Sequence, residues 1–462
     1  MPKSCCSTCR GKKTKTRIPP LTPHRKNLLE GDVAPHLRRL AFPLMWGMFA
    51  MTAFGIVDSL YISRLGTSAL AALGFTMPLV MFFMGIIFGL SVGTMSVLSR
   101  AYGEGDFDRV RRLATDSLVL TTILVAASAI VGYFLIDHIF LLMGASREIL
   151  PLIHHYMAIW YGGMTFLSIQ LIGNSCIRAT GDTAFPSMMM TLSAVISICL
   201  DPFLIFGWGP FPEMGLTGAA VTVAVAYVMT ATASLYFLVF RKKILLARVF
   251  HEGTVASWKK ILHVGIPSII SNMIAPLSAA IVTWMVADLG KEAVAALGIA
   301  TRIEGSAILV FYSLGAGVSI FTGQNFGAGN YGRIGEITNI AAEYSLAWGA
   351  AIAALLWIFA ERISLFFDGH ALVIAYITQY LRIVPISYGA MGIMVTANAA
   401  LNAMGKPLPA TALVLLRAFV IYIPLAWLAE KHYGFSGILM ALAFTNIAVG
   451  SVSYLWNKNA AA

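Results

Sequence analysis

Two aspartates, Asp58 and Asp201, lie within apolar stretches and are the residues best suited to chemistry. A carboxylate inside a membrane is costly unless it binds a proton, a cation or a partner, so both are functional candidates. The interval along the chain from Pro43 to Asp58 equals the interval from Pro186 to Asp201. At 1.5 Å per helical residue, both aspartates are expected roughly 22 Å from the inner side of the membrane. At one depth the pair could share a proton or jointly hold Na⁺, although each carboxylate could instead reach the outer headgroups.

The high hydrophobic and low charged content of the sequence indicates that the segments around these aspartates lie in a membrane. Of the 462 residues, 58% are hydrophobic and 11% are charged, and the mean hydropathy is +0.79. Soluble domains carry about 25% charged residues, so a soluble globule is excluded. Lipid-exposed backbone must be hydrogen-bonded internally, so we predict an all-α polytopic membrane protein with twelve transmembrane helices. The predicted spans are residues 40–63, 70–98, 114–143, 150–172, 186–207, 215–240, 262–286, 293–322, 338–359, 376–400, 409–429 and 435–457.

The two halves of the sequence repeat each other at a constant offset of 224 in residue number. The matched pairs include Pro43 with Pro267, Leu73-Gly74 with Leu297-Gly298, Gly103 with Gly327, and Tyr156 with Tyr380. Near the end of each half the offset becomes 219, where Gly215 matches Gly434. Six spans per half is an even number, so the halves share one membrane orientation about an axis along the membrane normal. We therefore predict a transporter with an N-lobe over 40–240, a connector over 241–260, a C-lobe over 261–457 and a short tail over 458–462.

A basic segment, residues 1–39, precedes the first span and holds ten of the 32 Lys and Arg residues. With both termini in the cytoplasm, 24 of these residues lie inside, five lie outside and three lie within spans. The positive-inside rule therefore favours a plasma (inner) membrane protein with this orientation. The charge indicates a topology-fixing cytoplasmic tail or contact with anionic lipid, and no nucleic-acid partner. A zinc site at the tail cluster of Cys5, Cys6 and Cys9 would need a fourth ligand, for which His24 is the only nearby candidate, so reduced or acylated thiols are favoured.

Other residues within the spans are weaker candidates. The repeat partner of Asp58 is Val282, and the region that matches Asp201 is also apolar, so the N-lobe holds both aspartates. Arg302 and Glu304 lie two residues apart at the start of the eighth span and face different sides of the helix. They predict a packing or interlobe salt-bridge role, with a cavity position as the alternative; Arg417 could likewise bond a carbonyl or line a cavity. Met51, Phe54, Met77 and Met81 are predicted to pack against lipid and the core or, as the alternative, to form an adaptable wall that contacts the drug.

Several ordered motifs between residues 34 and 457 resemble the multidrug and toxic compound extrusion (MATE) family, and most closely its DinF-like prokaryotic branch. The matching pieces are Val57-Asp58 followed by Ser63-Arg-Leu-Gly66, Arg178-Ala-Thr-Gly181, Leu200-Asp201-Pro202, Gly215-Leu-Thr-Gly218 and Gly323-Gln-Asn-Phe-Gly327. Each piece is short, but their order and spacing together are specific.

The resemblance implies an antiporter, not an enzyme, that exports cationic amphipathic compounds in exchange for H⁺ or Na⁺ and needs no cofactor. It implies that Asp58 and Asp201 couple the ion to transport, with Tyr156, Ser197 and Thr222 in the same polar network. Ser197 stands where the branch often has Asn. The resemblance also implies that the first helix bends at Pro43 on protonation. Because Pro267 repeats that proline, a plain helix-start role is an equal alternative.

The resemblance leaves one alternative function within the same superfamily, a lipid-linked oligosaccharide flippase. Such proteins commonly have a cationic cavity, whereas the expected cavity residues here are acidic, which favours drug export by a monomer in the lipid bilayer. The acid that the NorM-like branch carries in span seven is missing near Ser271 and Asn272, so no sodium site of that type is expected in the C-lobe.

Overall fold

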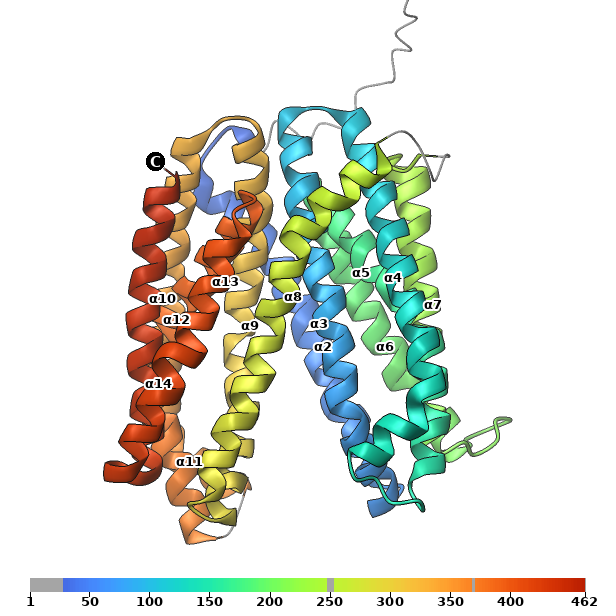
Figure 1. Cartoon of the computed structure of the whole chain (residues 1–462), viewed down its shortest axis with the longest axis vertical. Helices are drawn as coiled ribbons and strands as arrows, with labels where there is room; N and C mark the ends of the chain where they lie inside the picture. The colour runs from blue at the N-terminus through green and yellow to red at the C-terminus, as the bar shows by residue number, and fades with distance from the viewer. Residues whose placement is uncertain (1–27, 247–252, 368–369, 462) are drawn as a thin grey trace, which may run out of the picture.

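A computed structural model describes residues 28–246, 253–367 and 370–461, and within these residues the chain is helical with no strand (Figure 1). The first half contains α2 (Val33–Ser63), α3 (Thr67–Glu104), α4 (Phe107–Leu142), α5 (Leu150–Ala179), α6 (Ala184–Phe206), α7 (Leu216–Tyr236) and the π-helix η1 (Phe237–Lys242). The second half contains α8 (Thr254–Ala287), α9 (Lys291–Gly327), α10 (Tyr331–Phe367), α11 (Ala371–Ile383), the 3₁₀ turn η2 (Val384–Ser387), α12 (Tyr388–Ala403), α13 (Pro407–Leu415), the π-helix η3 (Leu416–Tyr422) and α14 (Ile423–Ala461).

These helices provide the twelve predicted membrane crossings. Ten segments of the described chain are long and apolar enough to cross a membrane, and the last of them, Pro407–Lys458, has 52 residues. Gly434 has φ +56° and ψ −136° and interrupts this segment, so it makes two crossings. The 30-residue α5 supplies the remaining one. The fold prediction is confirmed, with α11, η2 and α12 together forming the tenth crossing.

The sequence repeat is visible as a pseudo-two-fold contact between α3 and α9. A Cβ on Gly103 would lie 2.0 Å from the carbonyl oxygen of Gln324, and a Cβ on Gly327 would lie 2.1 Å from the carbonyl oxygen of Arg100. Positions 103 and 327, like positions 100 and 324, are separated by the repeat offset. The two helices therefore touch backbone to backbone in a symmetric pair of contacts that requires glycine.

A second symmetric pair of contacts lies further along the same helices. Gly93 of α3 packs against the backbone of Ile261 and Gly265 in α8, and Gly317 of α9 packs against Leu37 of α2. We call the end that contains Gly103 and Gly327 the closed end. Figure 1 shows the two lobes in contact toward this end and leaning apart toward the opposite end.

Helix α2 begins earlier than the sequence predicts. The predicted tail extends to residue 39, but the helix begins at Val33, because the one proline between Asp32 and Pro43, Pro35, falls in the first turn, where proline is tolerated. Pro43 therefore lies well inside α2, and its repeat partner Pro267 lies deeper still inside α8. A helix-start role for these prolines is thus wrong. The cysteine cluster and residues 1–27 of the predicted tail lie outside the described residues.

Candidate functional site

Asp58 and Asp201 come together in the N-lobe. Each lies five residues before the end of its helix, α2 for Asp58 and α6 for Asp201, and these helices pack against each other. The two carboxyl groups are within electrostatic range of each other. Asp201 is 0% exposed, so it does not reach the headgroups, and Asp58 is half-buried. The two acids therefore occupy corresponding positions near the ends of neighbouring helices, and their equal depth in a membrane stays a prediction.

The carboxylate oxygens of this pair are short of donors: the Thr222 hydroxyl lies beside Asp201, but it donates to the carbonyl oxygen of Gly218. Both oxygens of Asp201 and the Oδ1 atom of Asp58 are buried and accept no hydrogen bond from a described residue. An ionised carboxylate in such a place costs several kcal/mol unless it is compensated. A proton on either acid, or a cation shared by both, would supply the missing interaction. The pair is therefore suited to binding a proton or a monovalent cation.

Polar residues from two further helices surround the pair. Tyr156 of α5 lies within electrostatic range of both aspartates and of Tyr227 on α7. Thr222 of α7 lies beside Asp201, and its hydroxyl donates to the carbonyl oxygen of Gly218 at 3.1 Å. Ser197 is buried on α6, one turn before Asp201. The structure thus brings all five predicted ion-site residues into one region of the N-lobe. No group of three or more His, Cys, Asp or Glu that could hold a metal occurs within the described chain.

The sequence prediction missed Tyr227, which is within electrostatic range of Asp58. An aromatic residue in an apolar span gives no signal on its own. The one available signal is the repeat, because the offset of 219 matches Tyr227 with Asn446, a polar residue in the corresponding helix of the C-lobe.

A hydroxyl group holds the carbonyl of the interior proline in each lobe. Ser187 of α6 donates its hydroxyl to the carbonyl oxygen of Pro43. Thr411 of α13 donates to the carbonyl oxygen of Pro267 at 3.0 Å, and positions 187 and 411 are again related by the repeat offset. The interior prolines are therefore tied to a neighbouring helix in both lobes.

The predicted wall residues divide into two sets. Met51 and Phe54 are half-buried, and they lie seven and four residues before Asp58, on its face of α2. Met77 and Met81 of α3 are 42% and 56% exposed. The first set is therefore adjacent to the carboxylate pair. The second set continues, at four-residue spacing, the face of α3 on which Gly85 and Gly89 meet α8 of the C-lobe.

Glu304 and Arg302 form no salt bridge between the lobes within the described chain. Glu304 accepts a hydrogen bond from the hydroxyl of Tyr380, in its own lobe, whereas Arg302 is exposed and pairs with no described carboxylate. The interlobe salt bridge is thus wrong, because Glu304 points into the C-lobe. Glu304 is the fourteenth residue of α9, so it lies well within the helix and not at its start.

The C-lobe consequently contains a polar cluster of its own. The Nε atom of Arg417, in η3, donates to Oδ1 of Asn446 at 2.9 Å, and Nδ2 of Asn446 donates to Oγ of Ser387 at 2.9 Å. Arg417 is also within electrostatic range of Glu304. Tyr380, the partner of Glu304, is the repeat partner of Tyr156, and this match was the signal that could have located the cluster.

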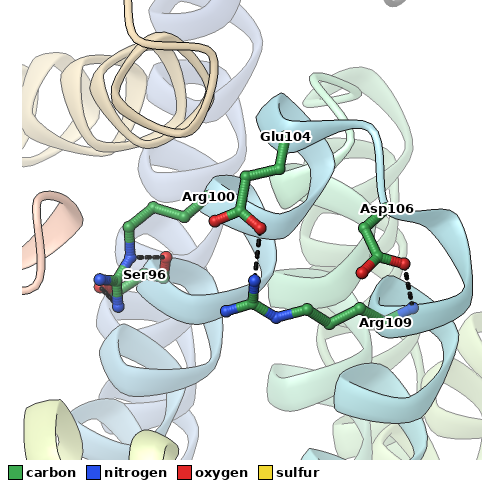
Figure 2. Close-up of polar contacts among 5 residues, drawn as sticks. All are labelled: Ser96, Arg100, Glu104, Asp106 and Arg109. Carbon is green, nitrogen blue, oxygen red and sulfur yellow. Dashed lines mark hydrogen bonds and ion pairs between the residues drawn. The ribbon is translucent and has the colours of Figure 1, made fainter.

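Polar contacts join the lobes at the closed end. The Oγ of Ser96 in α3 donates to the carbonyl oxygen of Asn402 in α12 at 2.5 Å, and the Nε of Arg100 donates to the carbonyl oxygen of Ser96 at 3.0 Å. Figure 2 shows Arg100 beside Ser96, and Arg109 paired with Glu104 at the turn between α3 and α4. Because Ser96 and Asn402 come from different lobes, this bond holds the closed end together.

Comparisons with known proteins agree with this architecture. The MatE family profile matches residues 43–203 and 267–428, two segments whose starts are related by the repeat offset. The chain is 34% identical to the FAD transporter of Shewanella oneidensis over 93% of this chain and 95% of that protein. It is 26% identical to the probable multidrug resistance protein YpnP of Bacillus subtilis over 91% and 94% of the two chains. The bent form of the Vibrio cholerae MATE transporter VcmN superposes with a TM-score of 0.89 at 29% identity, over 95% and 98% of the chains.

Proposed function

This chain belongs to the MatE family of multi-pass membrane transporters, and on that premise we propose that it is an ion-coupled antiporter that exports cationic amphipathic compounds. Asp58 and Asp201 bind the coupling ion, H⁺ or Na⁺. The observation that carries the proposal is the buried carboxylate pair with three oxygens that accept no hydrogen bond from a described residue. Family members are transporters and not enzymes.

The exchange of substrate for ion follows from competition between the two for one negatively charged site. A cationic substrate and the coupling ion both gain from the charge of Asp58 and Asp201, so binding of the ion disfavours the bound substrate. Neutralising the pair also removes repulsion between α2 and α6, and Pro43 lets α2 change its packing within the helix. The two lobes then alternate between openings on the two sides of the membrane.

We place the closed end in the cytoplasm of a cell whose plasma membrane holds the protein. Basic residues gather at the turn between α3 and α4 on this end, and the positive-inside rule assigns them to the cytoplasmic side. They are Arg100, Arg109, Arg111 and Arg112. In this orientation both termini are cytoplasmic and the lobes lean apart on the outer side. One chain contains both lobes, so a monomer provides the whole pathway.

Efflux from vesicles tests this proposal. Ethidium transport by the purified protein in proteoliposomes is measured under a pH gradient alone and under a sodium gradient alone. One gradient should drive ethidium transport in the wild type, and Asp58→Asn and Asp201→Asn should each remove that response. Full gradient-driven transport by both variants would contradict the proposal. Gradient-independent movement of a lipid-linked oligosaccharide would favour the flippase alternative.

A second substrate class is favoured by one comparison. The relative that is 34% identical is a FAD transporter, whereas the multidrug relative YpnP is 26% identical. We infer that an aromatic phosphate-bearing compound such as a flavin dinucleotide is a second candidate substrate. Flavin fluorescence in the medium of cells that express the chain, compared with cells that carry an empty vector, tests this candidate.

A further inference from the structure

The C-lobe cluster around Arg417 is rich in hydrogen-bond donors. Tyr312 and Tyr422 lie within electrostatic range of Arg417, and Tyr388 lies within range of the neighbouring Glu304. Four helical segments, α9, α12, η3 and α14, supply these residues and Asn446. We name Arg417, Tyr312, Tyr388 and Tyr422 the C-lobe donor cluster.

Several donors of this cluster have no partner among the described residues. Arg417 uses Nε to bond Asn446, and its two terminal nitrogens bond to no described residue. The hydroxyl of Tyr388, a residue that is 0% exposed, is also buried without a hydrogen-bond partner in the described chain. A buried donor such as the Tyr388 hydroxyl is normally satisfied, so this hydroxyl, together with the two unpartnered nitrogens of the half-buried Arg417, points to an acceptor that binds here.

Glu304 does not neutralise Arg417 by direct contact. Its carboxylate accepts from the hydroxyl of Tyr380, and no ion pair within 4.0 Å joins Glu304 to Arg417. The guanidinium group is instead oriented by the relay from Asn446 to Ser387. Its fork of terminal nitrogens therefore remains available in a fixed orientation.

The chemistry of these donors selects an anionic oxygen-bearing group. A guanidinium fork matches phosphate or carboxylate in bidentate geometry, and a tyrosine hydroxyl adds a further donor. Tyrosine rings also stack on aromatic ligands. Tyr312 is 47% exposed, so the cluster is accessible at this ring. The N-lobe site has the opposite character, because it presents buried acceptors that are short of donors.

We propose that the C-lobe donor cluster binds the phosphate of an aromatic phosphate-bearing substrate, with Arg417 as the principal contact and Tyr388 as the second donor. This inference rests on the second substrate class proposed above. The protein then has two substrate regions of opposite charge preference, with cations directed to the N-lobe and phosphates to the C-lobe.

Binding to the purified full-length protein in phospholipid-free detergent tests the inference. The ligands are flavin adenine dinucleotide, flavin mononucleotide and riboflavin, which share one ring system and differ in phosphate. Wild-type protein should bind both nucleotides more tightly than riboflavin, by roughly ten- to hundredfold, as expected for charge-assisted hydrogen bonds. Arg417→Ala should remove this difference while riboflavin binding stays within about twofold. Tyr388→Phe should reduce the difference by less, since it removes one neutral donor.

Arg362→Ala is the matched control, because Arg362 of α10 belongs to the same lobe, carries the same charge, is exposed and pairs with no described carboxylate. It should leave the preference for phosphate unchanged. Equal loss of nucleotide and riboflavin binding in Arg417→Ala would assign Arg417 to structural support and overturn the inference. Binding of phosphatidylglycerol micelles with no saturable binding of either nucleotide would also overturn it, because the phosphate would then belong to lipid. Failure of gradient-driven ethidium transport would contradict the ion-coupled proposal and leave these binding results independent of it.

Discussion

The N-lobe and the C-lobe place a tyrosine at the same point of the repeat and surround it with different charges. Tyr156 faces two aspartates in the N-lobe, whereas Tyr380 bonds a glutamate that lies within electrostatic range of Arg417 in the C-lobe. The charged groups of the first cluster are both acidic, and those of the second are one acid and one base. A duplicated scaffold can therefore carry two electrostatically distinct sites.

The scaffold itself is closely symmetric. The glycine contacts at Gly103 and Gly327 and the hydroxyl-to-carbonyl bonds at Pro43 and Pro267 recur at the repeat offset. The helix contacts repeat between the lobes, but the charges do not. Paired substitutions at repeat-related positions can therefore distinguish the effect of helix packing on transport from the effect of the charged residues of each lobe. The predictions below use such pairs.

The largest difference in transport is expected between a variant that removes a carboxylate of the N-lobe and one that removes a carboxylate of the C-lobe. Asp58→Asn removes the charge to which the ion and a cationic substrate both bind, so ion-driven ethidium transport should fall to the level of protein-free vesicles. Glu304→Gln keeps the shape of a side chain that bonds Tyr380 and should leave this transport within about twofold. Transport in proteoliposomes under the effective gradient measures both. Equal losses in the two variants would show that the lobes share one coupling function.

A smaller effect is expected at the contact between the lobes. Gly103→Val and Gly327→Val each place side-chain atoms against backbone of the other lobe, where even a Cβ would lie 2.0 or 2.1 Å from a carbonyl oxygen. Overpacking typically costs about 1–3 kcal/mol, so the closed state should lose roughly 5- to 150-fold in population. Spin labels attached to the two lobes at the closed end, with the distance between them measured, should show that the lobes move apart.

Gly335→Ala in α10 is the control, because nothing lies within 4 Å of its added Cβ. It should change neither the distance distribution nor transport. If only one of the two valine variants separates the lobes, the pseudo-two-fold contact is energetically asymmetric despite its symmetric geometry.

The sequence could predict the features that depend on linear patterns. Hydropathy located the twelve crossings, and counting residues along a helix gave Asp58 and Asp201 corresponding positions. The start of α2 at Val33 was missed because the helix continues beyond the apolar segment that defines a span. Hydropathy does not report a helix end that lies outside the lipid.

The sequence could not predict which polar groups meet in the C-lobe. Arg302 and Glu304 are neighbours in sequence, yet Glu304 bonds Tyr380, which is 76 residues away. Partner choice inside a lobe depends on how helices from distant segments are rotated, and that rotation is set by packing contacts such as Gly315 on Val395. The repeat offers the missing constraint, since Tyr380 matches the tyrosine already assigned to the N-lobe site.

The smallest expected effect compares the two proline contacts. Ser187→Ala removes the hydroxyl that bonds the carbonyl oxygen of Pro43, whereas Thr411→Val leaves Pro267 with a second donor, the hydroxyl of Ser271 at 3.0 Å. A single hydrogen bond contributes about 0.5–1.5 kcal/mol, so Ser187→Ala should shift the transport rate by roughly two- to twelvefold.

Thr411→Val should change the rate by less than about twofold, and Thr411→Val combined with Ser271→Ala should approach the effect of Ser187→Ala. Initial rates of ethidium transport in proteoliposomes measure all three. The double variant is the decisive one, because it makes the C-lobe proline as unsupported as the N-lobe proline in Ser187→Ala. If it still transports at the wild-type rate, bending at the interior proline matters in the N-lobe alone, and the functional asymmetry extends from the charges to the helices that carry them.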